Sequence, residues 1–234
     1  MKTVSLYSGI GGLDYAFRLA GFDILAAQEP NKLFRDVYKE NFPDCFMFDS
    51  ELDDLCPCVF QHREPEVILA DLTRFNVSEF ALRIDRVIHV IDECKVKIFV
   101  IGSSIIDESL DKLMEEKFKD LNYDIYSVVM NGKDFGDIED KERKFFVGYS
   151  KDMETYELEV EAKVTKPRTL GNRVFENKVL ELAEKKSYPK RYILKFDNEE
   201  IGYDMIDKAM PINTAFCLAQ EILNTFKEDG TNNN

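Results

Sequence analysis

Alternating strand-like and helix-like segments in the first 150 residues constrain the fold more than any other feature of this sequence. Apolar runs such as "EVILAD" (66–71) and "VKIFVIG" (96–102) alternate with segments whose apolar residues recur at helical spacing. Repeated βα units of this kind predict an α/β protein with a mostly parallel, doubly wound (Rossmann-like) sheet and helices on both faces. The runs at 123–131 and 142–150 have no helix between them, which predicts an antiparallel pair at one edge of the sheet.

The helices between these strands have recognisable ends. Gly21 is expected to close the first helix, Asn31 to begin the second, and Ser78 to cap the third. The four helical segments are 12–21, 31–42, 78–94 and 107–121, and the two earliest strands are 2–8 and 23–28.

The alternation of strand-like and helix-like segments ends after residue 152. Residues 156–167 alternate, 172–186 have helical spacing, 191–196 resemble a short strand, and 211–226 form a final amphipathic helix. We therefore expect one core from 1–152 and 208–228, a small region at 153–207, and a disordered tail at 229–234.

Composition excludes several classes of protein. No apolar run approaches the roughly 20 residues that span a bilayer. Five scattered cysteines indicate reduced thiols and an intracellular protein, cytoplasmic or nuclear. The "CPC" motif at 56–58 with His62 lacks a second pair of ligands, so no metal site is expected.

Charge is distributed unevenly along the chain. The net charge of −14 argues against broad nonspecific binding to nucleic acid, which depends on neutralising phosphates. The stretch 163–195 nevertheless carries ten basic residues against three acidic ones. This stretch is either an ordinary solvated surface or a contact to DNA or tRNA. The candidate contacts are Lys185, Lys186, Lys190 and Arg191.

A glycine-rich turn, "YSGIGG", joins the first strand to the first helix. Glycines let the backbone approach a ligand, and the helix N-terminus offers free N–H groups. Glu29 stands at the end of the second strand, where a carboxylate can accept hydrogen bonds from both ribose hydroxyls. The pair of signals favours a nucleotide-type cofactor over a purely structural turn.

The stretch from Ser5 to Asp44, including "YKENFP", resembles the opening of the cytosine-5 methyltransferase family, which acts on DNA and, in its Dnmt2-like branch, on tRNA. The resemblance extends over roughly 3–150 and 208–226, and it implies a fold that binds S-adenosylmethionine (SAM) or its product S-adenosylhomocysteine. By resemblance Glu29 would hold the ribose, Pro30 would pack near the adenine, and Asp49 would meet the adenine amino group. The implied cofactor residues are Tyr7, Ser8, Gly9, Ile10, Gly11, Gly12, Leu13, Glu29, Pro30, Asp49 and Asn213.

The catalytic motifs of that family are degenerate here. Thr73, Arg74 and Phe75 stand at the Pro-Cys-Gln positions, so an arginine replaces the nucleophile. Gly102 stands where the family has the glutamate of Glu-Asn-Val. The Gln-x-Arg-x-Arg segment reads Glu139, Lys141 and Arg143 at its key positions, which retains only the last arginine.

Three functions remain open on this basis. The first is an inactive homologue that keeps SAM and acts as a regulatory or structural subunit of a methyltransferase or nucleic-acid complex. The second is a working DNA or tRNA methyltransferase, alone or completed by a partner, in which Cys58 would have to replace the missing nucleophile. Cys58 precedes the strand 66–71 and is expected at the wrong edge of the sheet. The third is an interaction module without a cofactor.

Overall fold

A seven-stranded sheet forms the centre of the computed structural model, which describes residues 1–153, 158, 160–161 and 177–229. The strand order is β3-β2-β1-β4-β5-β7-β6. All neighbours are parallel except β7, which is antiparallel to both β5 and β6. This confirms the predicted α/β class and its antiparallel pair. The strands are β1 (Lys2–Leu6), β2 (Asp23–Gln28), β3 (Phe46–Phe48), β4 (Val67–Asp71), β5 (Ile98–Ser103), β6 (Tyr123–Asn131) and β7 (Glu142–Ser150).

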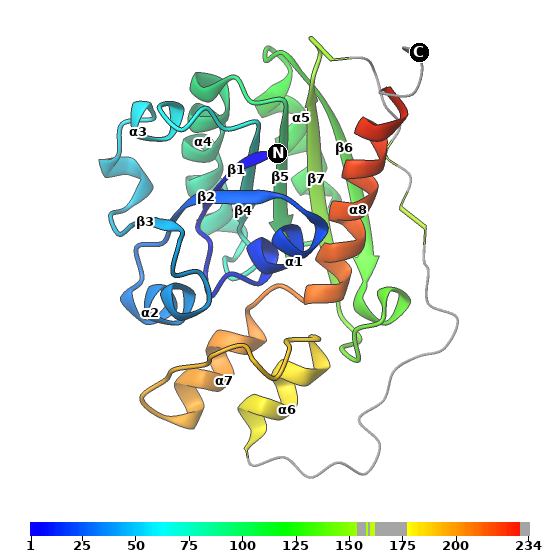
Figure 1. Cartoon of the computed structure of the whole chain (residues 1–234). Helices are drawn as coiled ribbons and strands as arrows, with labels where there is room; N and C mark the ends of the chain where they lie inside the picture. Colours follow the sequence, from blue (N-terminus) through cyan, green and yellow to red (C-terminus); the bar gives the residue numbers. More distant parts are fainter. Residues whose placement is uncertain (154–157, 159, 162–176, 230–234) are drawn as a thin grey trace.

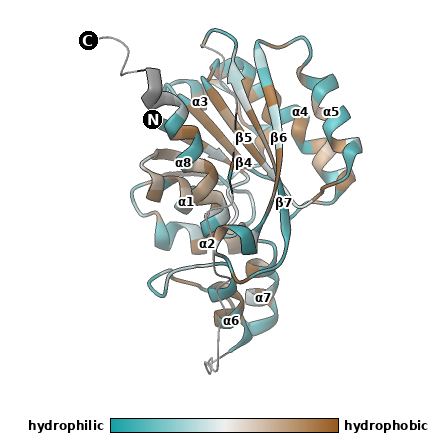
Figure 2. Cartoon of the chain, turned by 90° about the vertical axis from the view of Figure 1, so that its right-hand side faces the viewer, coloured by the Kyte–Doolittle hydropathy of each residue, from teal (hydrophilic) through white to brown (hydrophobic). Residues whose placement is uncertain are grey.

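Helices cover both faces of this sheet (Figure 1). α1, α2 and α8 contribute to the apolar core on one face, and α3, α4 and α5 contribute to the core on the other. Figure 2 shows the apolar strands enclosed between these layers, with hydrophilic residues outside. The helices are α1 (Gly12–Ala20), α2 (Lys32–Asn41), α3 (Cys58–Gln61), α4 (Val77–Cys94), α5 (Glu108–Phe118) and α8 (Ile212–Asp229), with 3₁₀ turns η1 (Leu52–Asp54) and η2 (Gly132–Phe135).

The strand order reverses between β1 and β4. Ligands of open α/β sheets bind at such a switch point, outside the carboxyl ends of the strands. The glycine turn follows β1 here, and Thr73 and Arg74 follow β4. The topology therefore brings the turn and Arg74, the residue predicted to stand at the nucleophile position, to one edge of the sheet.

Two further helices, α6 (Lys178–Lys185) and α7 (Glu199–Asp207), lie together below that edge (Figure 1). The expected helix at 172–186 begins at Lys178 in the described part of the chain, after its N-cap Asn177. α7 was not predicted, although Asn198 caps it and two glutamates fill its first turn. The helices place a small lobe over the carboxyl edge.

Three predicted details are wrong. Asn76, not Ser78, caps α4: it forms a capping box with Glu79, which starts the helix one residue earlier than expected. Residues 193–196 are irregular and do not form a strand. The side chain of Asn41 accepts a hydrogen bond from the Ile193 N–H and donates one to the Ile193 carbonyl, so both backbone groups are already used. The last helix continues to Asp229, so the predicted tail begins one residue too early.

Most of the alternating segment at 156–167 falls outside the described residues. The division into a core and a small region at 153–207 therefore stays a prediction. No helix in the described part of the chain combines the length and apolar character needed to cross a bilayer. Nor do the described residues bring three metal-ligating side chains together.

The cysteines depart partly from expectation. Cys56 and Cys58 form a disulfide, whose Cα–Cα distance of 5.2 Å lies within the usual range. The expectation of reduced thiols is wrong for this pair, while Cys45, Cys94 and Cys217 carry thiols. Gln61, on the same short helix as Cys58, donates to the Glu93 carbonyl near the C-terminal end of α4. α3 therefore lies toward the amino end of β5, away from the glycine turn.

Candidate functional site

The glycine turn is a compact loop held by several backbone hydrogen bonds. Gly9 and Gly11 have φ of +59° and +90°, which favours glycine at both positions. The Ser8 N–H donates to the Gln28 carbonyl, and the Gly11 N–H donates to the Ser8 carbonyl. Tyr7 also has positive φ, and its N–H donates to the side chain of Gln28. The turn is thus fixed against the end of β2.

Glu29 is fully buried directly after β2, and its carboxylate faces this turn. Oε2 accepts from the Gly9 N–H at 2.9 Å, and Oε1 accepts from the Asn31 N–H at 2.9 Å. The structure therefore brings the predicted ribose acceptor and the predicted glycine turn together. Both carboxylate oxygens already have partners within the chain.

Arg74 supplies the counter-charge for Glu29. Its Nη2 lies 2.7 Å from Glu29 Oε2 in an ion pair whose arginine side chain is only 11% exposed. Nη1 reaches the Tyr7 carbonyl at 3.5 Å, and it lies 3.2 Å from the point that a Cβ on Gly9 would occupy. The residue at the nucleophile position therefore lies along the glycine turn.

Aromatic rings hold the guanidinium in this position. The Arg74 Cζ lies 5.0 Å from the ring centroid of Phe34 on α2 and 4.7 Å from that of Phe75. Phe75 in turn packs edge-on against Tyr7, at 5.6 Å between centroids. Stacking of arginine on aromatic faces is favourable, especially away from water.

Residues 177–210, which include α6 and α7, form a small lobe that packs against the glycine turn. The Tyr192 hydroxyl donates to the Ile10 carbonyl, and the Tyr188 hydroxyl donates to the Met210 carbonyl at 3.1 Å. A Cβ on Gly12 would lie 2.2 Å from the Tyr188 hydroxyl oxygen, so only glycine allows this approach. Burial raises the pKa of both tyrosines well above the usual value, which keeps their hydroxyls protonated as donors. The lobe was not recognised as part of this site from the sequence.

Little space remains beside the turn. A cavity of about 10 Å³ is lined by Gly9, Gly12, Phe34, Arg74, Lys208 and neighbouring residues. Such a volume holds at most one water molecule, whereas cofactor and drug-sized ligands need roughly 300–1,000 Å³. With the Glu29 oxygens taken as well, the side chains as they stand do not fit SAM.

A larger cleft of about 440 Å³ lies beyond Arg74. Thr73, Arg74 and Lys208 line it together with Lys141 and Arg143, so three residues border both spaces. Asp71, which lines the small cavity and not this cleft, is buried; burial raises the pKa of its carboxyl, which accepts from the N–H of Thr73. This cleft is where the two degenerate motifs meet.

Gly102, the second degenerate position, is enclosed. It pairs with Asp71 at the end of the β4–β5 ladder, and a Cβ there would lie 2.6 Å from the terminal methyl carbon of Met210. A glutamate could enter only if Met210 moved. The apolar side chain of Met210 therefore takes the space that a longer side chain at position 102 would need.

The third degenerate segment forms a buried charge cluster. Arg143 Nη2 contacts Glu139 Oε2 at 3.4 Å, while Lys186 Nζ contacts Glu139 Oε1 at 3.0 Å. Lys141 pairs with Asp207 of α7 at 2.7 Å. The structure thus brings Glu139, Lys141 and Arg143 together and ties them to the lobe.

Lys186 departs from the predicted nucleic-acid surface. Its side chain is fully buried, and Nζ also donates to the carbonyls of Asp207 and Ala209. Burial lowers its pKa to about 8, although the charge of Glu139 opposes this shift. Lys186 therefore cannot contact a phosphate without unfolding this cluster. Lys190 and Arg191 are exposed and Lys185 is half-exposed, whereas residues 163–176 fall outside the described residues.

The remaining predicted cofactor residues lie in different surroundings. Leu13 is a buried core residue of α1, and Pro30 offers its carbonyl to Arg35. Asp49 directly follows β3 and is exposed. Asn213, at the start of α8, donates through its amide to the Gly136 carbonyl and the Ser187 hydroxyl, so its side chain serves a different contact.

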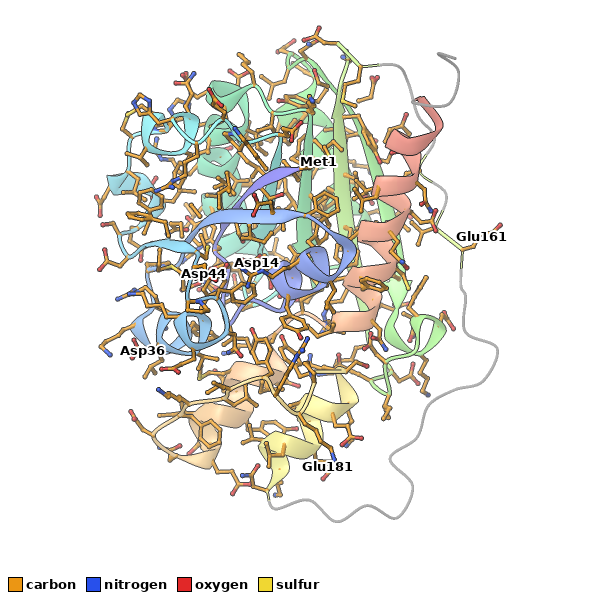
Figure 3. All side chains as sticks on the ribbon, viewed as in Figure 1. Met1, Asp14, Asp36, Asp44, Glu161 and Glu181 are labelled. Atoms are coloured by element: carbon orange, nitrogen blue, oxygen red, sulfur yellow. A yellow bond between two sulfur atoms is a disulfide. The ribbon has the colours of Figure 1, made fainter. Side chains whose placement is uncertain are left out.

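A buried polar cluster supports the turn from behind. Asp14, labelled in Figure 3, lies in the first turn of α1 and accepts from the hydroxyls of Ser5 at 2.7 Å and Tyr38 at 2.6 Å. Burial raises the pKa of this carboxyl from its ordinary 3.8 to about 7, despite those hydrogen bonds. The cluster links β1, α1 and α2 just below the glycine turn. No motif of the sequence had singled out Asp14.

This chain is similar in sequence to known cytosine-5 methyltransferases. Residues 1–70 match the family model of the C-5 cytosine-specific DNA methylases. The type II methyltransferase M.NgoPII of Neisseria gonorrhoeae is 27% identical over 174 residues, which are 66% of this chain and 49% of that protein. The tRNA (cytosine(38)-C(5))-methyltransferase of Spodoptera frugiperda is 37% identical over 70 residues, 29% of this chain and 21% of that protein. The chain spans about half the length, or less, of these relatives.

Solved structures share the fold over nearly the whole chain. A putative DNA modification methyltransferase encoded within an E. coli prophage has a TM-score of 0.82 at 13% identity, covering 97% of this chain and 99% of its own. A DNMT2 variant from Spodoptera frugiperda has a TM-score of 0.75 at 15% identity, covering 96% and 98%. At these identities the likeness concerns the fold alone.

Proposed function

We propose that this chain, which is similar to cytosine-5 methyltransferases of DNA and tRNA, is a catalytically inactive relative that acts through its surfaces. It would serve as a regulatory or structural subunit of a methyltransferase or nucleic-acid complex. One observation carries the proposal: Arg74, at the position of the nucleophile, holds its guanidinium against Glu29 instead of offering a reactive group to the cleft.

The chemistry of the family explains why this matters. A thiolate must add to carbon 6 of cytosine, and a carboxylic acid near ring nitrogen 3 supports the addition. Arg74 carries no nucleophile, and Gly102 carries no acid. Cys58 cannot replace the thiol in its present state, since it is bonded to Cys56 and lies away from the cleft. Loss of either group alone should lower the rate by orders of magnitude.

Whether this chain binds SAM is a separate question from whether it is catalytically active. SAM supplies the transferable methyl group in active relatives, and the glycine turn and Glu29 resemble the parts that would hold it. In this chain those parts are already paired with one another and with Arg74. No methyl-transfer step follows from this geometry.

A cofactor-free interaction module is the second candidate. The Arg74–Glu29 ion pair and the small cavity beside it favour this reading specifically, because both remove the space and the acceptor that a nucleoside needs. The two candidates share inactivity, and the first would admit a cofactor only if Arg74 moved away from Glu29.

Inactivity predicts a definite result with labelled SAM. The purified protein is expected to transfer no methyl groups to DNA or tRNA above background, because neither the nucleophile nor the acid is present. Incorporation into unmodified DNA and tRNA would be measured beside an active cytosine-5 methyltransferase. Transfer that persists in Arg74→Ala and disappears in Cys58→Ser would contradict the proposal.

Contact with nucleic acid is the second testable part. If Lys185, Lys190 and Arg191 neutralise phosphates, replacing all three by glutamate should reduce the slope of log K against log salt by about 3, roughly one for each lost contact. Affinity for tRNA and duplex DNA would be measured at several salt concentrations. The control reverses three cations on α5 and its C-cap, namely Lys112, Lys117 and the C-cap residue Lys119. Equal slopes in the two variants would leave the stretch as ordinary surface.

A further inference from the structure

We propose that Arg74 determines the ligand specificity of the glycine-turn site: its guanidinium occupies the position of a ligand and closes the site to adenosyl cofactors. The proposal rests on the proposed function only for the class of ligand that homologous sites take. It concerns the Arg74 guanidinium as a group that fills the ligand site, and it does not depend on the loss of the nucleophile.

The first step is the charge of the site. Glu29 is fully buried, so its carboxylate needs a compensating partner. In a nucleoside site the two ribose hydroxyls would donate to this carboxylate. Here Arg74 Nη2 approaches Oε2 to 2.7 Å, and two backbone N–H groups complete the shell. A nucleoside would have to displace a charge-assisted contact with neutral hydroxyl donors.

The second step is the shape of the occupant. The guanidinium is planar, and it lies within 5.0 Å of the centroids of two aromatic rings, Phe34 and Phe75. Its Nη1 reaches the Tyr7 carbonyl and closely approaches Gly9. Arg74 therefore fills the space along the turn in addition to neutralising Glu29.

The third step is the space that Arg74 divides. The cavity of about 10 Å³ beside Gly9 and the cleft of about 440 Å³ beyond it are both lined by Arg74. The Arg74 side chain is thus a wall between them. Truncating this side chain would join the two spaces, and the larger volume alone lies within the range of about 300–1,000 Å³ that holds small-molecule ligands.

Arg83 provides a matched control. Its Cζ lies 4.0 Å from the centroid of Phe75 and 5.8 Å from that of Tyr7, so it stacks on the same aromatic group. It does not pair with Glu29, and it is not among the residues that line the two spaces. Removing Arg83 perturbs the aromatic surroundings while the ion pair stays.

Calorimetric titration with S-adenosylhomocysteine tests the proposal. Arg74→Ala is expected to bind at least about 100-fold more tightly than the wild-type protein, because the ligand no longer has to break a buried ion pair. Arg74→Gln keeps an amide donor for Glu29 and so protects folding, and it should bind with an intermediate affinity. Arg83→Ala should behave like the wild-type protein.

Two results would overturn the proposal. One is wild-type affinity within about tenfold of Arg74→Ala, a difference that corresponds to less than a buried ion pair. The other is absence of binding by folded Arg74→Ala and Arg74→Gln alike, with folding checked by circular dichroism. Neither result concerns methyl transfer by the wild-type protein, so failure here remains distinguishable from failure of the proposed function.

Discussion

Replacing Arg74 by alanine is expected to lower the free energy of unfolding by about 3–5 kcal/mol, the usual consequence of leaving one member of a buried ion pair without its partner. Glu29 is fully buried and would keep only its two backbone donors. The loss would be measured by chemical denaturation. Arg83→Ala, which removes an arginine from the shared ring of Phe75, should cost clearly less because it does not pair with Glu29.

A double-mutant cycle separates the ion pair from packing. Glu29→Ala and Arg74→Ala should be strongly non-additive, with a coupling of at least about 2 kcal/mol, because the second substitution removes a charge that the first has already left unpaired. Additive losses would mean that Arg74 stabilises the turn through its aromatic contacts alone. Ligand should also stabilise Arg74→Ala more than the wild-type protein, since only an opened site can bind it.

The glycine turn shows how far sequence reasoning reaches. The spacing of the glycines and the position of Glu29 after the second strand predicted that the two would meet, and they do, through the Gly9 N–H. This was possible because parallel strands bring their carboxyl ends to one edge, so the placement follows from topology. The assignment of Arg74 and Gly102 to catalytic positions rests on the resemblance to the family's motifs and stays a prediction.

The destination of the Arg74 side chain could not be predicted in that way. The resemblance predicts that Arg74 replaces a nucleophile, but the rotamer that carries the guanidinium to Glu29 depends on Phe34 and Phe75, which come from different elements. The contacts of Tyr188, Tyr192 and Met210 with the glycine turn and Gly102 could not be predicted for a similar reason. These residues belong to a lobe whose second helix was not recognised at all.

Lys186 illustrates the opposite error. A run of basic residues gives the charge of a segment but not the direction of each side chain. Lys185 and Lys186 are adjacent, yet the first pairs with Glu181 near the surface and the second is buried against Glu139. The signal that separates them is the position at the end of α6, where Lys186 turns toward the carbonyls that follow α7.

The second large prediction compares substitutions of the two adjacent lysines, Lys185 and Lys186, each of which serves as the control for the other. Lys186→Ala should reduce the free energy of unfolding by about 3–5 kcal/mol, because Glu139 and two buried carbonyls lose their donor. Lys185→Ala removes only a half-exposed pair, and it should cost at most about 0.5 kcal/mol. Lys186→Met, which keeps the apolar stem, should fall between them. Equal losses in Lys185→Ala and Lys186→Ala would contradict the buried cluster.

The pH dependence of stability gives this prediction an independent signature. Because burial lowers the pKa of Lys186 from its ordinary 10.5 to about 8, the folded protein releases this proton before the unfolded chain does. Between those two values the unfolded state binds more protons, so this group makes stability rise with pH. The stability difference between the wild-type protein and Lys186→Met should therefore widen from about pH 8 upward. A difference that stays constant or narrows would mean that Lys186 holds its proton as firmly as an exposed lysine, and that the cluster with Glu139 keeps it fully charged.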